Sequence, residues 1–218
     1  MIGLRYQDII PNLNATFHIY GCGAIGSSTA IQLARMGAES FTLYDMDKVE
    51  LHNIGVSQYS TKDIGRLKID ALAEQLRDIN KDVDCVGIKK KVEKSTIMYM
   101  SGNDIAILGF DSMQSRYDAV QALYTSSIKP RLIIDGRMGA EHYQQTVSTS
   151  LTDYLTTWYP DSEGDPEPCT AKATSYCSNL AGSMICNTIR KIETGQPYSR
   201  QFNFNFPTFT LDSKVQKI

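Results

Sequence analysis

The stretch Gly21-Cys22-Gly23-Ala24-Ile25-Gly26 decides the fold that this sequence predicts. It follows an apolar run at residues 15–20 and opens a segment, 24–36, in which apolar side chains recur at helical spacing. Between a strand and a helix, such a turn lets backbone N–H groups approach a phosphate, and the helix N-terminus adds partial positive charge. The alternative is a glycine turn that serves strand–helix packing alone. We expect a nucleotide-binding core over residues 15–140.

Alternating strand and helix patterns follow this turn along the chain. The expected strands are 40–44, 84–88, 105–110 and 132–135, and the expected helices are 63–79 and 115–124. Alternation of this kind predicts an α/β fold with a Rossmann-like, mostly parallel sheet and helices on both faces.

The pattern changes in the C-terminal third of the chain. The elements expected there are an exposed strand at 142–150, a polar loop within 151–176 and a helix at 177–193. Phe202, Phe204 and Phe206 alternate with asparagines, which is typical of a strand with one buried face. We therefore expect antiparallel C-terminal strands and a C-terminal helix beside the core, all in a single domain, 1–218.

The composition is that of an ordinary globular protein. A net charge of −2 without a long basic run gives a nucleic-acid partner no electrostatic support. No apolar run approaches the ~18 residues that a membrane span needs, and the N-terminus lacks the order of a signal peptide. None of the five cysteines belongs to a Cys-x-x-Cys pair. We expect a reducing, cytoplasmic protein with no nucleic-acid partner, no membrane segment and no zinc.

Asp45 follows the second expected strand, at the distance from Gly21 where dinucleotide-binding folds place an acid on the ribose hydroxyls. Taken alone, the turn and Asp45 would suit an NAD(P)-dependent oxidoreductase. The residues that come after Asp45 favour a different chemistry.

A longer pattern of residues carries that chemistry. Its members are the glycine turn, Asp45, Asp47, Asn53-Ile54, Asp63-Ile64-Gly65, Lys68, Asp111 and Arg116. In this pattern the sequence resembles the ThiF/MoeB/HesA superfamily, the fold shared by ubiquitin-activating enzymes and their bacterial sulfur-carrier relatives. The segment Asp135-Gly136-Arg137-Met138-Gly139 is similar to that of short, single-domain ThiF-like proteins of phages and plasmids.

The resemblance implies ATP-dependent adenylation of the C-terminal carboxylate of a small ubiquitin-like or sulfur-carrier protein. Asp45 would then bind the ribose, Asn53 and Lys68 the phosphates, and Asp111 a Mg²⁺ ion. The remaining nucleotide contacts would come from Gly21, Gly23, Ala24, Ile25, Gly26 and Asp47. Cys169 occupies a loop position where the family often keeps a cysteine for thioester or persulfide transfer.

The sequence departs from the family at one phosphate-binding position. Val56 stands where the pattern Asn-Ile-x-Arg-Gln has its arginine. Losing a charge-assisted contact costs about 1.5–3 kcal/mol unless another group replaces it. Arg137, expected at the end of the fifth strand, is our favoured replacement over Arg5 and Arg66. The alternative is a nucleotide-binding pseudoenzyme or interaction module that has lost adenylation.

Four of the implied site residues also have a purely structural interpretation. They are Lys68 as an exposed helix lysine, Asn53 as a residue that braces a turn, Asp47 as a cap and Cys169 as an unreactive loop cysteine.

The resemblance finally implies two partners. One is a carrier protein with a Gly-Gly C-terminus, and the other is a second copy of this chain in a symmetric homodimer. Region 141–218 would meet them, and the face of Phe202, Phe204 and Phe206 needs something to cover it.

Overall fold

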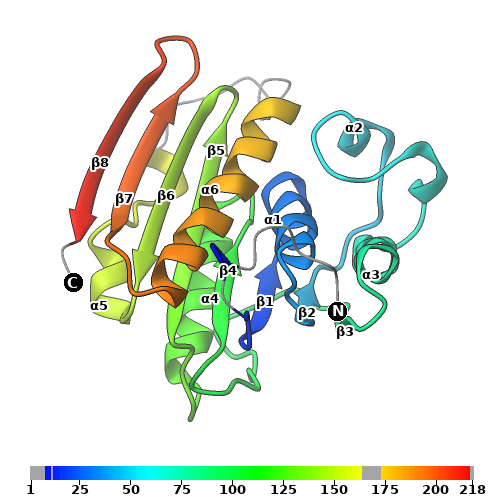
Figure 1. The fold of residues 1–218 in the computed structure, drawn as a ribbon, viewed down its shortest axis with the longest axis horizontal. Helices are drawn as coiled ribbons and strands as arrows, with labels where there is room; N and C mark the ends of the chain where they lie inside the picture. The colour runs from blue at the N-terminus through cyan, green and yellow to red at the C-terminus, as the bar shows by residue number, and fades with distance from the viewer. Residues whose placement is uncertain (1–7, 11, 164–172, 217–218) are drawn as a thin grey trace.

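The computed structural model describes residues 8–10, 12–163 and 173–216, which form one eight-stranded sheet. The strands are β1 (Thr16–Tyr20), β2 (Ser40–Tyr44), β3 (Asp84–Ile88), β4 (Ile105–Leu108), β5 (Leu132–Gly139), β6 (His142–Ser148), β7 (Tyr198–Asn205) and β8 (Thr210–Gln216). Their order across the sheet is β3-β2-β1-β4-β5-β6-β7-β8, as Figure 1 shows. The first five are parallel and the last three antiparallel to their neighbours, which confirms the predicted mixed sheet.

Helices cover both faces of the sheet, as predicted (Figure 1). One face carries α1 (Ala24–Arg35), α3 (Lys68–Ile79) and α6 (Ser175–Glu193), and the other carries α4 (Met113–Thr125) and α5 (Leu151–Leu155). The α1 face buries a large apolar layer that includes Leu33, Leu72 and Ile185. The α4 face buries a second layer around Leu123 and Tyr154.

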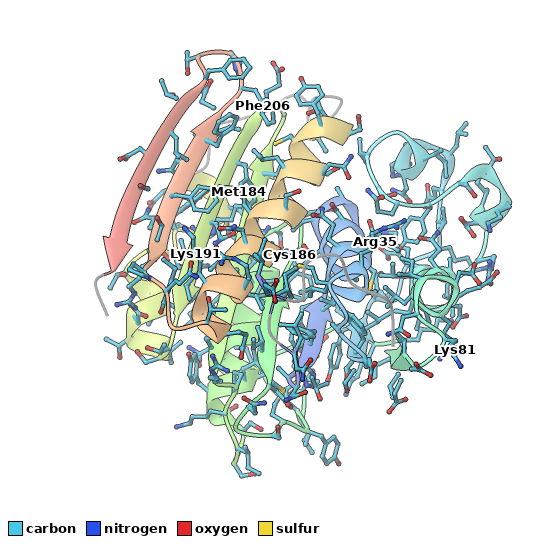
Figure 2. All side chains as sticks on the ribbon, viewed as in Figure 1. Arg35, Lys81, Met184, Cys186, Lys191 and Phe206 are labelled. Carbon is cyan, nitrogen blue, oxygen red and sulfur yellow. The ribbon has the colours of Figure 1, made fainter. Side chains whose placement is uncertain are left out.

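Helices α1 and α6 pack at very close range. A Cβ on Gly182 of α6 would lie 2.4 Å from Oγ of Ser28 on α1, so only glycine fits there. Cys186 lies between the same two helices, with its Sγ 3.8 Å from the carbonyl oxygen of Thr29 (Figure 2). The C-terminal helix therefore completes the apolar layer over the helix that follows the glycine turn.

The chain between β2 and α3 leaves the sheet as a polar excursion. It contains the short helix α2 (Leu51–Ile54) and a 3₁₀ turn, η1 (Thr61–Asp63). The helix predicted over 63–79 begins only at Lys68. Gly65 has a φ of +86° and Lys48 pairs with Leu67 as an isolated bridge, so this stretch has left the helical conformation.

The C-terminal region is richer in strands than predicted. β5 runs on to Gly139 because it forms a tight hairpin with β6, in which Gly139 pairs with His142. The single strand expected around Phe202–Phe206 is a hairpin of β7 and β8. The sequence of β8 shows no apolar alternation, so it gave no strand signal. The loop expected within 151–176 contains α5 and a 3₁₀ turn, η2 (Asp161–Glu163), in its described part.

Within the described ranges, no helix is long and apolar enough to cross a membrane.

Candidate nucleotide site

The glycine turn lies in close contact with the ends of two neighbouring strands. Gly21 has a φ of +88°, and its N–H donates to the carbonyl of Tyr44 at 2.9 Å. A Cβ on Gly26 would lie 1.9 Å from the Gly21 carbonyl oxygen, and one on Gly21 would lie 2.9 Å from that of Gly109. The turn thus presses α1 against β1 and β4, while the first N–H groups of α1 have no partner within the helix. This arrangement suits the binding of an anion.

Asp45 is attached directly to the turn. One carboxylate oxygen accepts the N–H of Cys22 at 2.7 Å, and the other accepts the N–H of Asp47 at 2.8 Å. Burial raises the pKa of Asp45 above its usual value, against the lowering influence of Lys68 and of the two backbone donors. Burial also raises the pKa of the Cys22 thiol well above its usual value, which agrees with a small turn residue rather than a nucleophile.

Lys68 is the cation nearest to this carboxylate cluster. It opens α3 and is only 9% exposed, so the alternative of an ordinary exposed helix lysine is wrong. The Nζ of Lys68 lies 3.2 Å from a carboxylate oxygen of Asp47. The backbone N–H of Lys68 donates to the backbone carbonyl of Asp47 at 3.0 Å. The Tyr59 hydroxyl donates to the carbonyls of Cys22 at 2.6 Å and Lys68 at 3.3 Å, which ties α3 to the glycine turn. Tyr59 gave no signal in the sequence, because its shorter hydrogen bond goes to Cys22, which is 37 residues away.

Asn53 and Val56 belong to the polar excursion. The side-chain oxygen of Asn53 accepts the N–H of Glu50 at 2.9 Å, so the predicted bracing of a turn is present. None of the described residues accepts a hydrogen bond from its amide nitrogen, which stays free for a ligand. The excursion returns to α1 through the N–H of Gln58, which donates to Ser27 Oγ at 3.1 Å.

Asp111 lies beyond the C-terminal end of β4, just before α4, and is exposed. Parallel strands bring this end of β4 beside the glycine turn, because β4 pairs with β1. Among the described residues, no three His, Cys, Asp or Glu side chains come together as a metal site. A Mg²⁺ ion at Asp111 would therefore take its other ligands from phosphates and water, as this ion often does.

Arg137 occupies a different setting from the one expected. Because β5 continues to Gly139, Arg137 is a residue within the strand and does not follow it. Its side chain is buried, and its Nε donates a hydrogen bond to the Asp135 carboxylate at 2.8 Å. Arg116 also donates to Asp135, and the Tyr154 hydroxyl does so at 3.2 Å. Two guanidinium groups thus share one carboxylate, and Nη2 of Arg137 is buried without a partner among the described residues.

The cysteines fall into two groups. Cys169 lies outside the described residues, so its role stays a prediction. Cys22, Cys85, Cys177 and Cys186 are buried free thiols. Burial raises the pKa of Cys177 to about 12, which agrees with a packing residue on α6.

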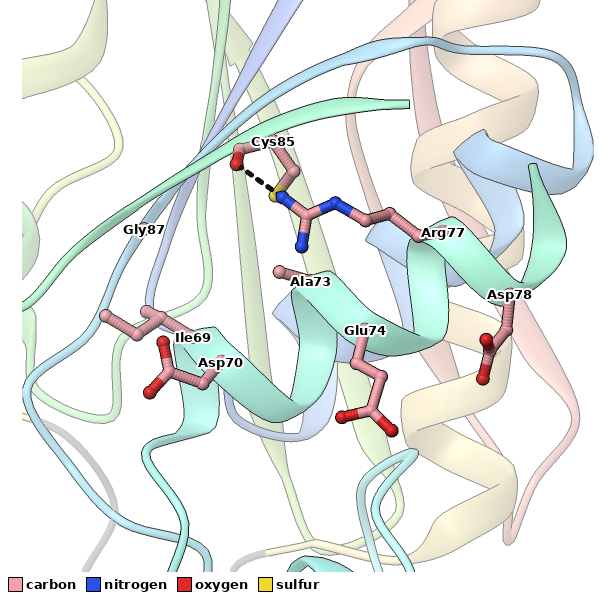
Figure 3. Close-up of a pocket in the computed structure, with 8 residues that line it drawn as sticks. All are labelled: Ile69, Asp70, Ala73, Glu74, Arg77, Asp78, Cys85 and Gly87. Carbon is pink, nitrogen blue, oxygen red and sulfur yellow. Dashed lines mark hydrogen bonds between the residues drawn. The ribbon is translucent and has the colours of Figure 1, made fainter. Parts of the chain in front are cut away.

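A groove of about 390 Å³ lies between α3 and the edge strand β3 (Figure 3). Arg77 crosses it and donates to the carbonyl of Cys85 at 3.0 Å, which covers part of the strand edge. Neither the glycine turn nor Asp45 lines this groove, so it is separate from the candidate nucleotide site.

Known proteins share both the sequence pattern and the fold. A sequence model of the ThiF family matches residues 6–217. Ubiquitin-like modifier-activating enzyme 5 of Bombyx mori is 41% identical over 87 residues, which are 38% of this chain and 22% of that protein. A probable molybdopterin-synthase adenylyltransferase of Gracilaria tenuistipitata var. liui is 29% identical over 106 residues, which are 48% of this chain and 30% of that protein. The chain thus spans less than a third of the length of either relative.

The crystal structure of E. coli MccB with ATP has the same architecture. It superposes with a TM-score of 0.70 at 17% identity, covering 96% of this chain and 65% of that one. At this identity the likeness shows the fold.

Proposed function

Because this chain belongs to the ThiF family, we propose that it is an ATP-dependent adenylyltransferase that activates the C-terminal carboxylate of a small ubiquitin-like or sulfur-carrier protein. The observation that carries the proposal is the chain of contacts from the glycine turn through Asp45 and Asp47 to Lys68. These groups meet at the carboxyl edge of the sheet, where ligands of α/β folds bind.

In the proposed reaction, the described residues of the candidate site have separate tasks. The turn and the first N–H groups of α1 hold a phosphate, and Asp45 accepts hydrogen bonds from the ribose hydroxyls. Lys68 exchanges the largely exposed Asp47 for a phosphate of ATP. Asp111 would hold Mg²⁺, which would neutralise charge on the phosphates.

The bond changes follow from the substrate chemistry. An oxygen of the carrier's C-terminal carboxylate attacks the α-phosphorus of ATP. A new P–O bond forms, the bond to the β,γ-unit breaks, and pyrophosphate leaves. Cations placed before the reaction stabilise the charge that gathers on the leaving oxygens.

Two observations favour the pseudoenzyme alternative. Val56 provides no charge at the family's arginine position, and Arg137 is bound to Asp135 instead of lying free at the site. The oxidoreductase interpretation rests only on the turn and Asp45, and it accounts for neither Lys68 nor the family match.

The experiment is pyrophosphate exchange with ATP, Mg²⁺ and a small β-grasp carrier protein that ends in Gly-Gly. Exchange by the wild-type protein supports adenylation, and its absence despite ATP binding by calorimetry favours the pseudoenzyme. Tight NAD binding without ATP binding would defeat both. Arg137→Lys keeps a positive charge beside Asp135 but loses the planar guanidinium group. It therefore tests the role of Arg137 without leaving the Asp135 carboxylate short of a cation.

We also propose a symmetric homodimer that uses the tip of the β7–β8 hairpin. Phe202 packs inside against Tyr143, with ring centroids 5.6 Å apart. The rings of Phe204 and Phe206 pack against each other near the surface, with their centroids 4.8 Å apart. Phe209, which contacts Phe204, is 81% exposed. A monomer by light scattering at tens of micromolar protein would refute this assembly.

A further inference from the structure

Residues 157–161 form a strap that crosses from β5 to α4. At the β5 end, the carbonyl oxygen of Thr157 accepts a hydrogen bond from Nη1 of Arg137 at 2.7 Å. The ring of Tyr159 lies over the same guanidinium, with 5.5 Å between the ring centroid and Cζ. The strap therefore covers Arg137, which the sequence predicts as a phosphate-binding residue.

The other end of the strap is fixed to the first turn of α4. The carboxylate of Asp161 accepts the N–H of Met113 at 2.7 Å and that of Gln114 at 3.1 Å. Nε1 of Trp158 donates to the carbonyl of Met113 at 2.9 Å. A negative charge on two free N–H groups at a helix N-terminus is a favourable contact. Helix α4 also has its own cap, Ser112, whose hydroxyl accepts the N–H of Ser115 at 3.0 Å.

The first turn of α4 is in turn connected back to Arg137. Arg116 donates to Asp135, to the carbonyl of Gly136 at 2.8 Å and to the carbonyl of Phe110. Asp135 holds Arg137, and Phe110 directly precedes Asp111. A closed ring of contacts thus runs from the strap through α4 and the cluster of arginines to the strap again.

We propose that Asp161 is a positioning residue, which locks the strap onto α4 so that Arg137 and the loop carrying Asp111 are held as one unit. This inference rests on the proposed adenylation, in which Asp111 would hold Mg²⁺ and the Asp135 cluster with Arg137 and Arg116 keeps the loop that carries Asp111 in place. Without the Asp161 carboxylate the strap loses both N–H contacts and is attached to α4 through Trp158 alone. The Thr157 carbonyl and the Tyr159 ring are then held less firmly over Arg137. The Arg137 guanidinium, which already has one unpartnered nitrogen, would keep Asp135 and Gln144 as partners and should become less well ordered.

The single tryptophan of the chain reports on the strap without any activity assay. Trp158 packs against Tyr117, with ring centroids 5.0 Å apart. In Asp161→Ala we expect red-shifted Trp158 emission and stronger acrylamide quenching, with Asp161→Asn intermediate because its amide oxygen still accepts one bond. The matched control is Ser112→Ala, which removes a cap from the same helix and leaves the strap attached. Unchanged emission in Asp161→Ala, or an equal change in Ser112→Ala, overturns the proposal.

The functional arm is a double-mutant cycle in pyrophosphate exchange, with folding of each variant checked by circular dichroism. Asp161→Ala should lower the exchange rate at saturating ATP about fivefold to tenfold, because the loop that carries Asp111 is then positioned less accurately. It should also raise the Mg²⁺ concentration that gives half of the maximal rate. In an Arg137→Lys background the same change should cost little more, because coupled residues are not additive.

Ser112→Ala should have the same small effect in both backgrounds. Additive losses from Asp161→Ala and Arg137→Lys would show that the strap does not act through the arginine, which overturns the coupling. If the wild-type protein shows no exchange, the proposed function fails, and the part of the inference that concerns exchange fails with it. The fluorescence experiment then still decides whether Asp161 holds the strap.

Discussion

Lys68 and Asp47 form the ion pair that a triphosphate would have to open. Removing the ammonium group in Lys68→Ala should weaken ATP binding by about 1.5–3 kcal/mol, the usual range for a hydrogen bond to a charged group. Calorimetry with ATP and Mg²⁺ measures this loss. Lys62→Ala is the control, since Lys62 lies exposed on η1 in the same excursion. Equal affinities of the two variants would remove Lys68 from the site.

Asp45 gives the site a dependence on pH. Its burial raises its pKa, so the carboxylate takes up a proton at a higher pH than an ordinary aspartate does. Ribose hydroxyls need the ionised form as acceptor, and nucleotide affinity should fall as the pH drops through that raised pKa. Asp45→Asn should bind weakly with no such dependence, as calorimetry over a pH series will test.

The raised pKa of Asp45 affects the stability of the fold in the opposite direction to nucleotide affinity. The folded protein keeps the Asp45 proton to a higher pH than the unfolded chain does, so this group lowers the free energy of unfolding as the pH rises from the unfolded pKa to the raised one. In Asp45→Asn that part of the pH dependence of stability should disappear.

At the scale of elements, the contact between β1 and α1 depends on Gly26. A methyl group there would meet the Gly21 carbonyl oxygen, which is backbone and cannot swing aside. Gly26→Ala should lower the free energy of unfolding by about 1–3 kcal/mol or more, the cost of overpacking. Gly23→Ala in the same turn is the matched control, because no atom lies within 4 Å of its added Cβ. Urea unfolding of both variants tests the prediction, and an equal loss of stability in the two would contradict it.

The sequence predicted those elements that local patterns specify. Alternating apolar runs and the glycine turn were enough for the parallel half of the sheet and its helices, because burial on both faces leaves a clear periodicity. The ends of β5 and α3 were wrong, since they depend on pairing between segments: β5 is extended by β6, and Lys48 with Leu67 replaces the first turn of the predicted helix.

The candidate site was predictable only in part for a similar reason. Asp45 and Lys68 follow a spacing that the family pattern describes. Tyr59, Tyr154 and Asp161 act through partners that are distant in the chain, and no local signal marks them. The placement of Arg137 inside β5 also depended on that unpredicted strand extension.

At the scale of the molecule, Asp135 joins β5, α4 and α5 in a buried cluster with two arginines. Asp135→Asn leaves those guanidinium groups without a compensating charge, and should cost about 3–5 kcal/mol of stability. Asp153→Asn is the control, since it removes a partly exposed partner of Arg200 and should cost no more than about 1 kcal/mol. Chemical denaturation measures both losses. Comparable losses would mean that the buried cluster stabilises the fold no more than an ion pair near the surface does.

The close packing of α6 on α1 affects how the protein folds during synthesis. The first half of the chain holds the turn and the strands of the nucleotide site, yet its apolar surface is covered by a helix that begins at Ser175. During synthesis, this surface stays exposed to water until the ribosome has made α6, which ends at Glu193. Until then the nascent chain exposes an apolar face of a parallel sheet, the kind of surface that chaperones hold. A fragment that ends at residue 140 should accordingly aggregate when expressed alone, although it contains every strand of the parallel half.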